Sequence, residues 1–482
     1  MTRQKDQQGS RMPQANELML CFYGDDFTGS TASLECAAQA GARSVLFLQP
    51  PTAERLARYP GLQVLGVAGM TRSMTPNAME SVLRPAFNAL KSLGAPHVHY
   101  KVCSTFDSSP AVGSIGKAIE VAMSIFEAPF VPLLVAAPAL GRYCLFGNLF
   151  ARLGLEGEVY RLDRHPSMSR HPTTPADESD LRLHLAHQTA REIALFDILK
   201  LMLPAKQAHA ELDALVRPGP RIVLFDILRS EQLRLIGQLL DFYGSRSSPL
   251  FSVGSSAVEE ALAAHWAGKG YLKGVQEWPV AGRAEPLLVA SGSCSPVTGS
   301  QIQWALQHGY AEVPLDTVRL AAGKESAELE NAATDAAVKH VQAGRGVIVH
   351  TSKGSADPRM EATARLLAER GLGGLPGGNL SGQLLGGALG RVIRGILRQT
   401  GVRRVVIAGG DTAGYAASAL GIEALEMLAP LTPGAPLCRA DAPGSPAHGL
   451  ELNFKGGQIG PVNYFAQVAS GHGVNEKGVA SL

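Results

Sequence analysis

Short apolar segments alternate with helical patterns along the chain, and this alternation predicts its elements. The first apolar segment, Leu18–Tyr23, stops at a Gly-Asp-Asp turn, and Leu34 and Ala37 then recur at helical spacing. A second buried strand follows at Ser44–Gln49. Strand, helix and strand in this order form a βαβ unit, which predicts a parallel sheet covered by helices.

The same alternation continues through most of the first half of the chain. It predicts strands at Leu62–Ala68, His97–Val102, Val131–Ala136, Arg221–Asp226 and Leu250–Val253, and helices at Asn77–Leu93, Val112–Phe126, Arg182–Leu203 and Ala257–Trp266. The stretch from Gly147 to Gln188 lacks this pattern and is rich in His, Arg and Pro. A long polar insertion of this kind favours a functional loop or an oligomer contact. Its residues His165, Arg170 and His171 suit either an anion site or structural hydrogen bonds, and their spacing matches no zinc motif.

The pattern restarts after a stretch of Gly, Lys, Trp, Pro and Arg between Gly268 and Glu285, which is typical of a linker. Strands are predicted at Leu287–Ala290, Gly346–His350, Arg404–Ala408 and Leu450–Phe454, and helices at Gly299–His308, Pro376–Leu397 and Tyr415–Leu420. We therefore predict an α/β protein of two domains, 18–275 and 276–470, each a largely parallel sheet flanked by helices. Residues 1–17 and 471–482 are predicted to be tails.

Composition and charge narrow the function classes. Of the 482 residues, 45% are hydrophobic and 18% charged, which is typical of a globular protein. The net charge of +2 argues against a broad nucleic-acid or anionic-membrane surface. The six cysteines are scattered, which fits a reducing cytoplasm. There is no signal-peptide pattern in the first 17 residues and no apolar run of membrane-spanning length, so we expect a cytoplasmic protein.

Polar and charged residues recur where the predicted strands of the first half end. Asp25 and Asp26 follow the first strand directly, and the simplest alternative is that one caps the next helix while the other faces water. Further polar residues at strand ends are Arg72, Lys101, Ser104, Asp107 and Arg142. Because the ends of parallel strands share one edge of a sheet, we expect these side chains to converge.

The second half carries three turns rich in glycine and hydroxyl groups at strand ends, namely Ser291–Thr298, Gly409–Gly414 and Lys455–Gly460. Glycine lets backbone N–H groups reach phosphate oxygens, although none of the turns is a Walker loop or a GxGxxG loop. The acids and isolated bases of the first half suit a small anionic, hydroxylated substrate. An Asp could accept a hydroxyl proton, and Mg²⁺ bridging nucleotide phosphates is expected. Together these features favour a small-molecule kinase.

Five motifs in one order carry a resemblance to a known family. They are Gly24-Asp25-Asp26-Phe27-Thr28-Gly29-Ser30, Lys101-Val102-Cys103-Ser104-Thr105-Phe106-Asp107-Ser108, Gly141-Arg142-Tyr143, Ser291-Gly292-Ser293-Cys294-Ser295 and Gly409-Gly410-Asp411-Thr412. With them the chain resembles the four-carbon acid sugar kinase family from about Leu18 to Phe465. The Arg- and His-rich insertion also resembles the branch that includes 3-oxo-isoapionate kinases.

The resemblance implies ATP-dependent phosphorylation of a sugar acid, such as a threonate, an erythronate or a 3-oxo-tetronate. It implies that the first domain binds the sugar acid, the second binds ATP, and the active site lies in the cleft between them. Asp25 or Asp26 is then the candidate general base. Arg72, Lys101 and Asp107 are the candidate substrate ligands. The candidate ATP ligands are Ser291, Ser293, Gly409, Gly410, Asp411, Thr412, Gly456 and Gly457.

One departure and two rival functions remain open at this point. Many family members carry a further acid where this chain has Thr31-Ala32-Ser33, which leaves no third carboxylate to assign there. The rivals are an NAD-dependent oxidoreductase that uses Gly409–Gly414 for the pyrophosphate and a non-catalytic sugar-acid-binding protein. The metal ligands, the phosphorylated hydroxyl and assembly into a homo-oligomer are also left open.

Overall fold

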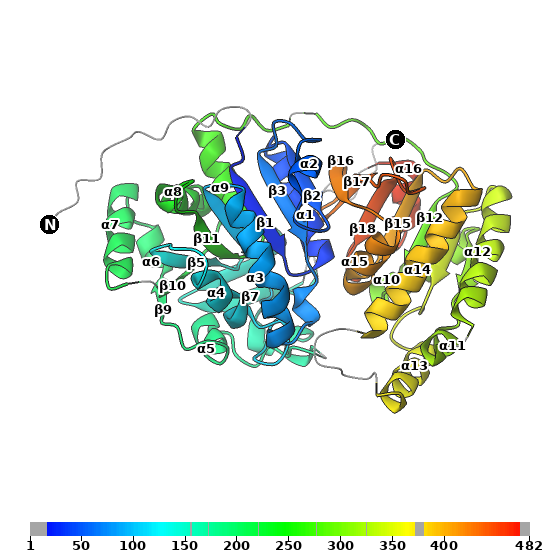
Figure 1. Ribbon diagram of the computed structural model, residues 1–482. Helices are drawn as coiled ribbons and strands as arrows, with labels where there is room; N and C mark the ends of the chain where they lie inside the picture. Colours follow the sequence, from blue (N-terminus) through cyan, green and yellow to red (C-terminus); the bar gives the residue numbers. More distant parts are fainter. Residues whose placement is uncertain are drawn as a thin grey trace.

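The computed structural model describes residues 17–154, 157–171, 173–219, 221–275, 277–323, 325–371 and 380–472. Its strands form one continuous 15-stranded sheet and a separate three-stranded sheet. The long sheet runs in the order β13-β14-β12-β15-β18-β17-β16-β2-β3-β1-β4-β11-β5-β10-β9 (Figure 1). The fold is therefore α/β, as predicted, but the two halves share one hydrogen-bonded sheet.

The strands that the first half contributes to the long sheet run parallel to one another. They are β1 (Leu20–Gly24), β2 (Ser44–Phe47), β3 (Val64–Ala68), β4 (His97–Lys101), β5 (Phe130–Leu134), β9 (Ile193–Phe196), β10 (Arg221–Phe225) and β11 (Leu250–Gly254). Their burial on both faces explains the near-continuous apolar runs in the sequence.

The second half repeats a parallel sheet, and an antiparallel ribbon connects it to the first. The parallel strands are β12 (Leu288–Ser291), β13 (Ala311–Pro314), β14 (Val347–His350), β15 (Arg404–Ala408) and β18 (Glu451–Lys455). The ribbon consists of β16 (Ala424–Thr432) and β17 (Ala435–Asp441). The three successive pairs β18–β17, β17–β16 and β16–β2 are antiparallel, so the two parallel sheets run in opposite directions.

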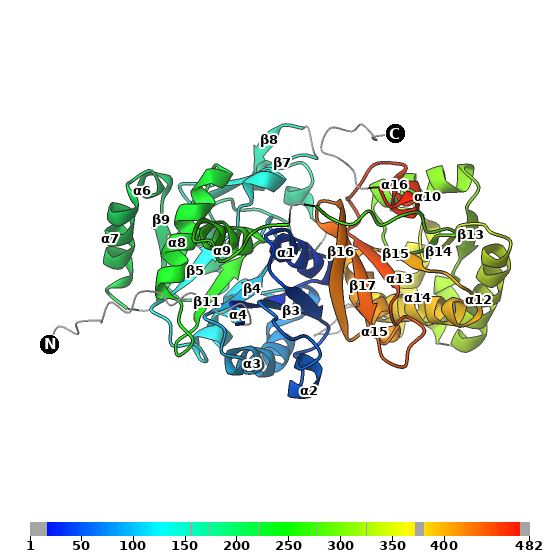
Figure 2. The same ribbon diagram turned by 90° about the horizontal axis from the view of Figure 1, so that it is seen from above.

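The ribbon contains register shifts between Met427 and Ala429 and between Ala429 and Thr432. Such bulges increase the local twist of a sheet. Helix α1 (Phe27–Gln39) lies at this twist and contacts both halves: β1, β2 and β3 on one side and β16, β17, β18 and helix α15 (Gly410–Ala419) on the other. Figure 2 shows α1 between the two groups of strands.

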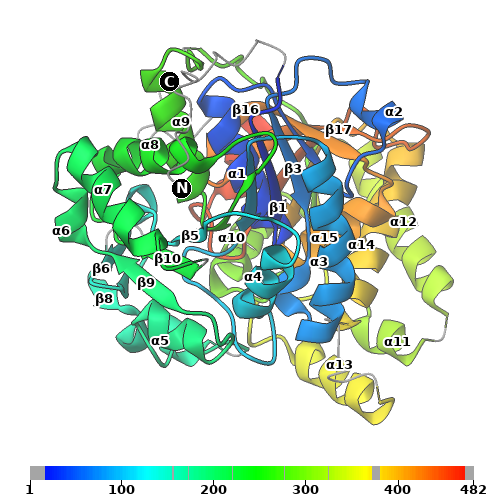
Figure 3. The same cartoon turned by 60° about the vertical axis from the view of Figure 1, so that its left-hand side comes forward.

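Helices cover both faces of each parallel sheet. In the first half, α1, α8 (Leu233–Tyr243) and α9 (Ala257–Gly268) cover one face, while α3 (Pro76–Ser92) and α4 (Ile115–Met123) cover the other (Figure 2). In the second half, α10 (Pro296–Gln307) packs with α16 (Tyr464–Ser470), and α12 (Ser326–Gln342), α14 (Leu380–Gln399) and α15 form a layer on the opposite face (Figure 3). The remaining α-helices are α2 (Ala53–Leu56), α5 (Leu181–Ala186), α6 (Ile198–Leu201), α7 (Ala205–Val216), α11 (Thr317–Ala322) and α13 (Pro358–Glu369).

Two regions differ from the sequence-based expectation. The long helix predicted for Arg182–Leu203 is wrong, because the chain there forms α5, then β9, then α6. Ile193–Phe196 pairs with Ile222–Phe225 and so adds an edge strand to the sheet. The stretch predicted to be irregular, Gly147–Gln188, contains β7 (Asn148–Arg152) and β8 (Val159–Arg161), which form a three-stranded antiparallel sheet with β6 (Arg142–Leu145) just before it.

Helix α14 confirms most of the helix predicted at Pro376–Leu397, although 376–379 lie outside the described residues. The predicted tails also lie outside them, apart from Glu17, Gly471 and His472. Across the part of the chain that the structure describes, no helix is both long and apolar enough to span a bilayer.

Glu35 of α1 links the two halves through a buried hydrogen bond. Its Oε2 accepts the N–H of Gly434, in the turn between β16 and β17, at 2.7 Å. Burial raises the pKa of Glu35 to about 7, because the charged form loses its hydration, while the Gly434 N–H opposes this rise.

We expect Glu35→Gln to remove one source of pH-dependent stability. The folded-state pKa of Glu35 lies above its ordinary 4.5, so the folded protein binds more protons between these values, and stability from this group falls as pH rises from about 4.5 to 7. Glutamine keeps an acceptor for Gly434 and stays neutral. Melting temperatures at pH 5.5 and 8.0 should therefore converge in the variant compared with the wild type. An unchanged difference between the two pH values would contradict this role.

Candidate active site

The Gly-Asp-Asp turn after β1 places both carboxylates inside the protein. Asp25 is 3% exposed and Asp26 is 6% exposed. Asp26 is the N-cap of α1, and its Oδ1 accepts the N–H of Gly29 at 3.1 Å while its Oδ2 accepts the Thr28 hydroxyl at 2.6 Å. One acid thus caps the helix, as the simplest alternative proposed, but the other does not face water.

Arg72 neutralises both acids. Its Nε and Nη2 donate to the two carboxylate oxygens of Asp25 at 3.0 and 2.7 Å, and Nη2 also donates to Asp26 Oδ1 at 2.7 Å. Nη1 makes no hydrogen bond to any residue in the described ranges. Burial raises the pKa of Asp25 despite Arg72. Burial also acts to raise the pKa of Asp26, but Arg72, Lys101 and the hydrogen bonds outweigh it, so that pKa falls below its usual value.

Lys101 brings a second positive charge to the same turn. It ends β4, in register with Gly24 of β1, and is 6% exposed. A Cβ atom at Gly29 would lie 2.4 Å from both Asp26 Oδ1 and Lys101 Nζ. Asp26 Oδ1 and Lys101 Nζ therefore both lie close to Gly29, where a side chain would clash with them.

Asp107 lies in the loop that follows Lys101 and does not contact the acids directly. Its Oδ1 accepts the hydroxyl of Thr105 at 2.7 Å, and Cys103 Sγ lies 2.9 Å from the same hydroxyl. Phe106 has a positive φ of 58°, a conformation that is unfavourable for an aromatic residue and is often found at functional sites. The charges of both Asp107 and Arg72 act on the Cys103 thiol, so this loop lies near the acidic turn.

The three glycine-rich turns of the second half meet one another. A Cβ at Gly292 would lie 2.0 Å from Thr412 Oγ1, and a Cβ at Gly457 would lie 2.8 Å from Ser293 Oγ. Gly409 has a φ of 121°, which favours glycine, and it immediately precedes α15. Ser291 is fully buried, and its hydroxyl has no hydrogen-bond partner in the described structure. The side chain of Asp411 lies outside the described residues, while Gly456 follows β18 beside Gly457.

The acidic turn and the glycine turns also meet each other. A Cβ at Gly410 would lie 3.6 Å from both Asp26 Oδ2 and Thr28 Oγ1. The aromatic rings of Phe27 and Phe454 pack just behind, with centroids 4.7 Å apart. The N-termini of α1 and α15 therefore point to one place, where their partial positive charges favour an anion.

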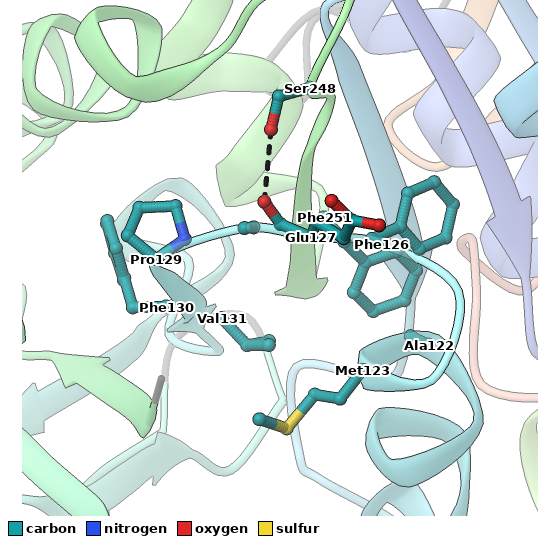
Figure 4. A pocket seen from close by; sticks show the side chains of 10 residues that line it. Ala122, Met123, Phe126, Glu127, Pro129, Phe130, Val131, Ser248 and Phe251 are labelled. Carbon is teal, nitrogen blue, oxygen red and sulfur yellow. Dashed lines mark hydrogen bonds between the residues drawn. The ribbon is translucent and has the colours of Figure 1, made fainter. Parts of the chain in front are cut away.

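The space at this meeting point is small. It has a volume of 10 Å³ and is lined by Asp25, Asp26, Phe27, Met70, Arg72, Ser73, Gly410 and Tyr415. A larger hollow of 610 Å³ lies at the opposite ends of the strands, around Phe126, Phe130 and Phe251 (Figure 4). Its lining is mostly apolar, so it does not suit a charged sugar derivative.

Several residues at the site were not singled out from the sequence. Thr28 binds Asp26, and Met70, Ser73 and Tyr415 line the small pocket. The glycine-rich sequence after Lys455 predicted a turn, but no role was predicted for Lys455 itself. In the polar insertion, the Nδ1 atoms of His165 and His171 accept backbone N–H groups two or three residues further on, so these histidines shape local turns.

Two family models match almost the entire described chain. A sugar-binding N-terminal domain matches residues 20–262, and a nucleotide-binding C-terminal domain matches residues 288–465. The chain is 43% identical to the 3-oxo-isoapionate kinase of Paraburkholderia graminis over 455 residues, which cover 94% of each chain. It is 30% identical to the 3-oxo-tetronate kinase of Methylobacterium radiotolerans, with 93% of this chain and 98% of that one covered.

Solved structures share the fold. A protein of Salmonella typhimurium LT2 superposes with a TM-score of 0.70 at 24% identity, covering 93% of this chain and 98% of that one. A protein of Haemophilus influenzae superposes with a TM-score of 0.64 at 21% identity, covering 94% and 99%. With both domain models matched and close relatives that are sugar-acid kinases, the chain belongs to the four-carbon acid sugar kinase family and is an ATP-dependent kinase of small sugar acids.

Proposed function

We propose that the chain transfers the γ-phosphoryl group of ATP to a hydroxyl of a 3-oxo sugar acid between Asp26 and Gly410. The observation that carries this proposal is the approach of the acidic turn to the N-terminus of α15. Phosphoryl transfer needs mainly positioning and charge neutralisation, together with a group that accepts the hydroxyl proton. Both helix N-termini and both basic side chains lie at the point where the charge of the transferred group would develop.

Within this proposal Asp26 is the general base. Its Oδ2 faces Gly410 and would lie between the substrate hydroxyl and the nucleotide. Asp25 is instead a positioning residue, because both its oxygens are bound to Arg72. Its ionised form is also less favourable, since burial raises its pKa.

Arg72 and Lys101 are the proposed ligands of the substrate carboxylate. The Nη1 group of Arg72 retains its N–H donors, although Asp25 and Asp26 take the rest. Lys101 Nζ forms no ion pair with a described residue and lies beside the same turn. Asp107, in the loop after Lys101, is proposed to accept a substrate hydroxyl.

The nucleotide is proposed to bind at the three glycine turns. Backbone N–H groups of Gly410, Gly456 and Gly457 would contact its phosphates, together with the hydroxyl groups of Ser291, Ser293 and Thr412. The N–H of Gly409 already donates to the carbonyl of Lys455 at 3.0 Å, so Gly409 would shape the turn instead. Mg²⁺ is proposed to arrive with ATP. No group of three or more His, Cys, Asp or Glu residues suited to a metal occurs within the described ranges, which fits an ion held mainly by phosphates and water.

The preferred substrate is proposed to be 3-oxo-isoapionate, a branched five-carbon acid. Identity to the 3-oxo-isoapionate kinase of Paraburkholderia graminis is 43%, against 30% to the 3-oxo-tetronate kinase of Methylobacterium radiotolerans. The domain boundary near residue 275, a homo-oligomer and a cytoplasmic location stay predictions.

A coupled assay of ADP release tests the substrate. We expect the highest kcat/KM with 3-oxo-isoapionate, at least tenfold above 3-oxo-tetronates, threonate and erythronate, because an unfilled or clashing branch costs about 1–3 kcal/mol. NMR of the product would identify the phosphorylated hydroxyl. NADH serves as the control nucleotide. Turnover that requires NADH, or sugar-acid binding without ADP release from any substrate, would contradict the kinase proposal.

A further inference from the structure

Lys455 is a buried lysine that lies behind the glycine turns, and the proposed reaction gives it no role. It ends β18 and is 0% exposed. Its Nζ donates to Thr298 Oγ1 at 2.9 Å and lies 5.6 Å from the centre of the Tyr464 ring. A buried ammonium group is unfavourable unless an anion compensates for its lost hydration.

The described structure offers Lys455 no such anion. No carboxylate of a described residue lies within 4.0 Å of its Nζ. The partner Thr298 belongs to the first turn of α10, where the helix dipole is positive. Burial accordingly lowers the pKa of Lys455 to about 7.

The position of Lys455 connects it to the nucleotide turns. Ser291, Ala408 and Lys455 are in register at the ends of three neighbouring parallel strands, so their side chains point to the same face of the sheet. The Ser291 hydroxyl on that face is buried and unpartnered within the described residues. Thr298 in turn donates to the carbonyl of Gly457 at 2.8 Å. Lys455 therefore supports the Gly457 turn from behind.

We infer that Lys455 is a positioning residue of the nucleotide site. When phosphates bind at the glycine turns, the Lys455 side chain becomes an ammonium group and holds the Gly457 turn through Thr298. This inference rests on the proposed nucleotide binding. Lys455 takes its proton from solvent, and the negative charge of the phosphates supplies the missing anion. It follows that nucleotide binding and proton uptake are coupled.

The other polar groups near Lys455 are not expected to take up a proton when a nucleotide binds. Burial raises the pKa of Tyr464, and Glu35 raises it further, so this phenol stays neutral. Burial lowers the pKa of His350, which shares the sheet face and already pairs with Glu312. Thr298, Gln301 and Asn453 do not titrate. Arg359 and Lys353 also act to lower the pKa of His350.

Calorimetric titration of ADP with Mg²⁺ at pH 8.0, in buffers of different ionisation enthalpy, tests the inference. The phosphates are already fully ionised at this pH, so proton uptake reports on the protein. We expect uptake of about 0.9 proton by the wild type, as follows from a free-state pKa of about 7. Lys455→Met should show almost none and bind ADP at least tenfold more weakly at pH 7. Lys339→Met, which removes an exposed lysine from α12, should match the wild type.

The pH dependence separates this role from a merely structural one. The ADP Kd of the wild type should rise toward tenfold per pH unit between pH 7.5 and 9, whereas that of Lys455→Met should stay flat. Wild-type binding without proton uptake would overturn the role of Lys455 and leave the kinase proposal intact. Failure of the wild type to bind any nucleotide would overturn both.

Discussion

Replacing Asp26 with asparagine is expected to lower kcat by about 10²–10⁴-fold, the usual cost of losing a general base. Asparagine is also a good N-cap, and its Oδ1 can still accept the N–H of Gly29, so α1 should keep its start. The effect should therefore appear mainly in turnover, with the Kd for ADP close to wild type. Some stability should also be lost, because Arg72 then keeps only Asp25 as a counter-charge.

Two companion variants sharpen this measurement. Thr28→Ala removes the hydroxyl that binds Asp26 Oδ2 and should reduce kcat less than Asp26→Asn does. One hydrogen bond to a charged group contributes about 1.5–3 kcal/mol, which sets a ceiling of about 150-fold. Asp25→Asn should act mainly on the KM for the sugar acid, because Asp25 anchors Arg72. A kcat for Asp26→Asn within tenfold of wild type would assign the proton transfer to another group.

Arg72→Met is expected to cause the largest loss of stability. It leaves two buried carboxylates without their shared counter-charge, a change that costs about 3–5 kcal/mol in fully buried pairs. The Arg72 side chain is 25% exposed, so the lower end of that range applies. Urea unfolding should show this loss. Arg72→Lys should recover part of it, because one ammonium group cannot bind both acids as the guanidinium group does.

The loss of stability in Arg72→Met should also depend on pH. Without Arg72 the pKa of both acids rises, so the variant is least stable relative to wild type at high pH and recovers as the acids become protonated. Arg84→Met breaks an exposed pair with Glu80 on α3 and should change stability by less than about 1 kcal/mol. A similar, small effect of Arg72→Met would contradict the proposed electrostatic role.

Local pattern was sufficient to predict the acidic turn and most of the parallel strands, although β9 was predicted as helix and β13 was not predicted. Strands such as β1 and β15 are buried on both faces, so their sequences are continuous apolar runs bounded by glycine or charge. The two acids stood out because charged residues seldom follow a buried strand in pairs. The glycine turns stood out because each lies at the end of a predicted strand. Their roles in nucleotide binding stay proposals.

Features that depend on partners distant in sequence could not be predicted in this way. The segment that forms β9 has amphipathic neighbours, and only its pairing with β10 makes it an edge strand. Arg72 was expected to bind substrate, but its contacts with Asp25 and Asp26 require the three-dimensional approach of two strand ends. Lys455 has an ordinary sequence context, and its lack of an acidic partner is visible only after folding.

The β2–β16 pairing, which joins the halves, has a consequence for how such enzymes can diversify. Leu46 and Phe47 pair with Ala424 and Leu425 there, and Arg55, Arg58 and Tyr59 add side-chain bonds to Glu423 and Asp441. The first half contributes charged side chains to the site, whereas the second contributes mainly backbone and hydroxyl groups. A change of sugar substrate should therefore require substitutions mainly in the first half, while the residues that join the halves stay unchanged.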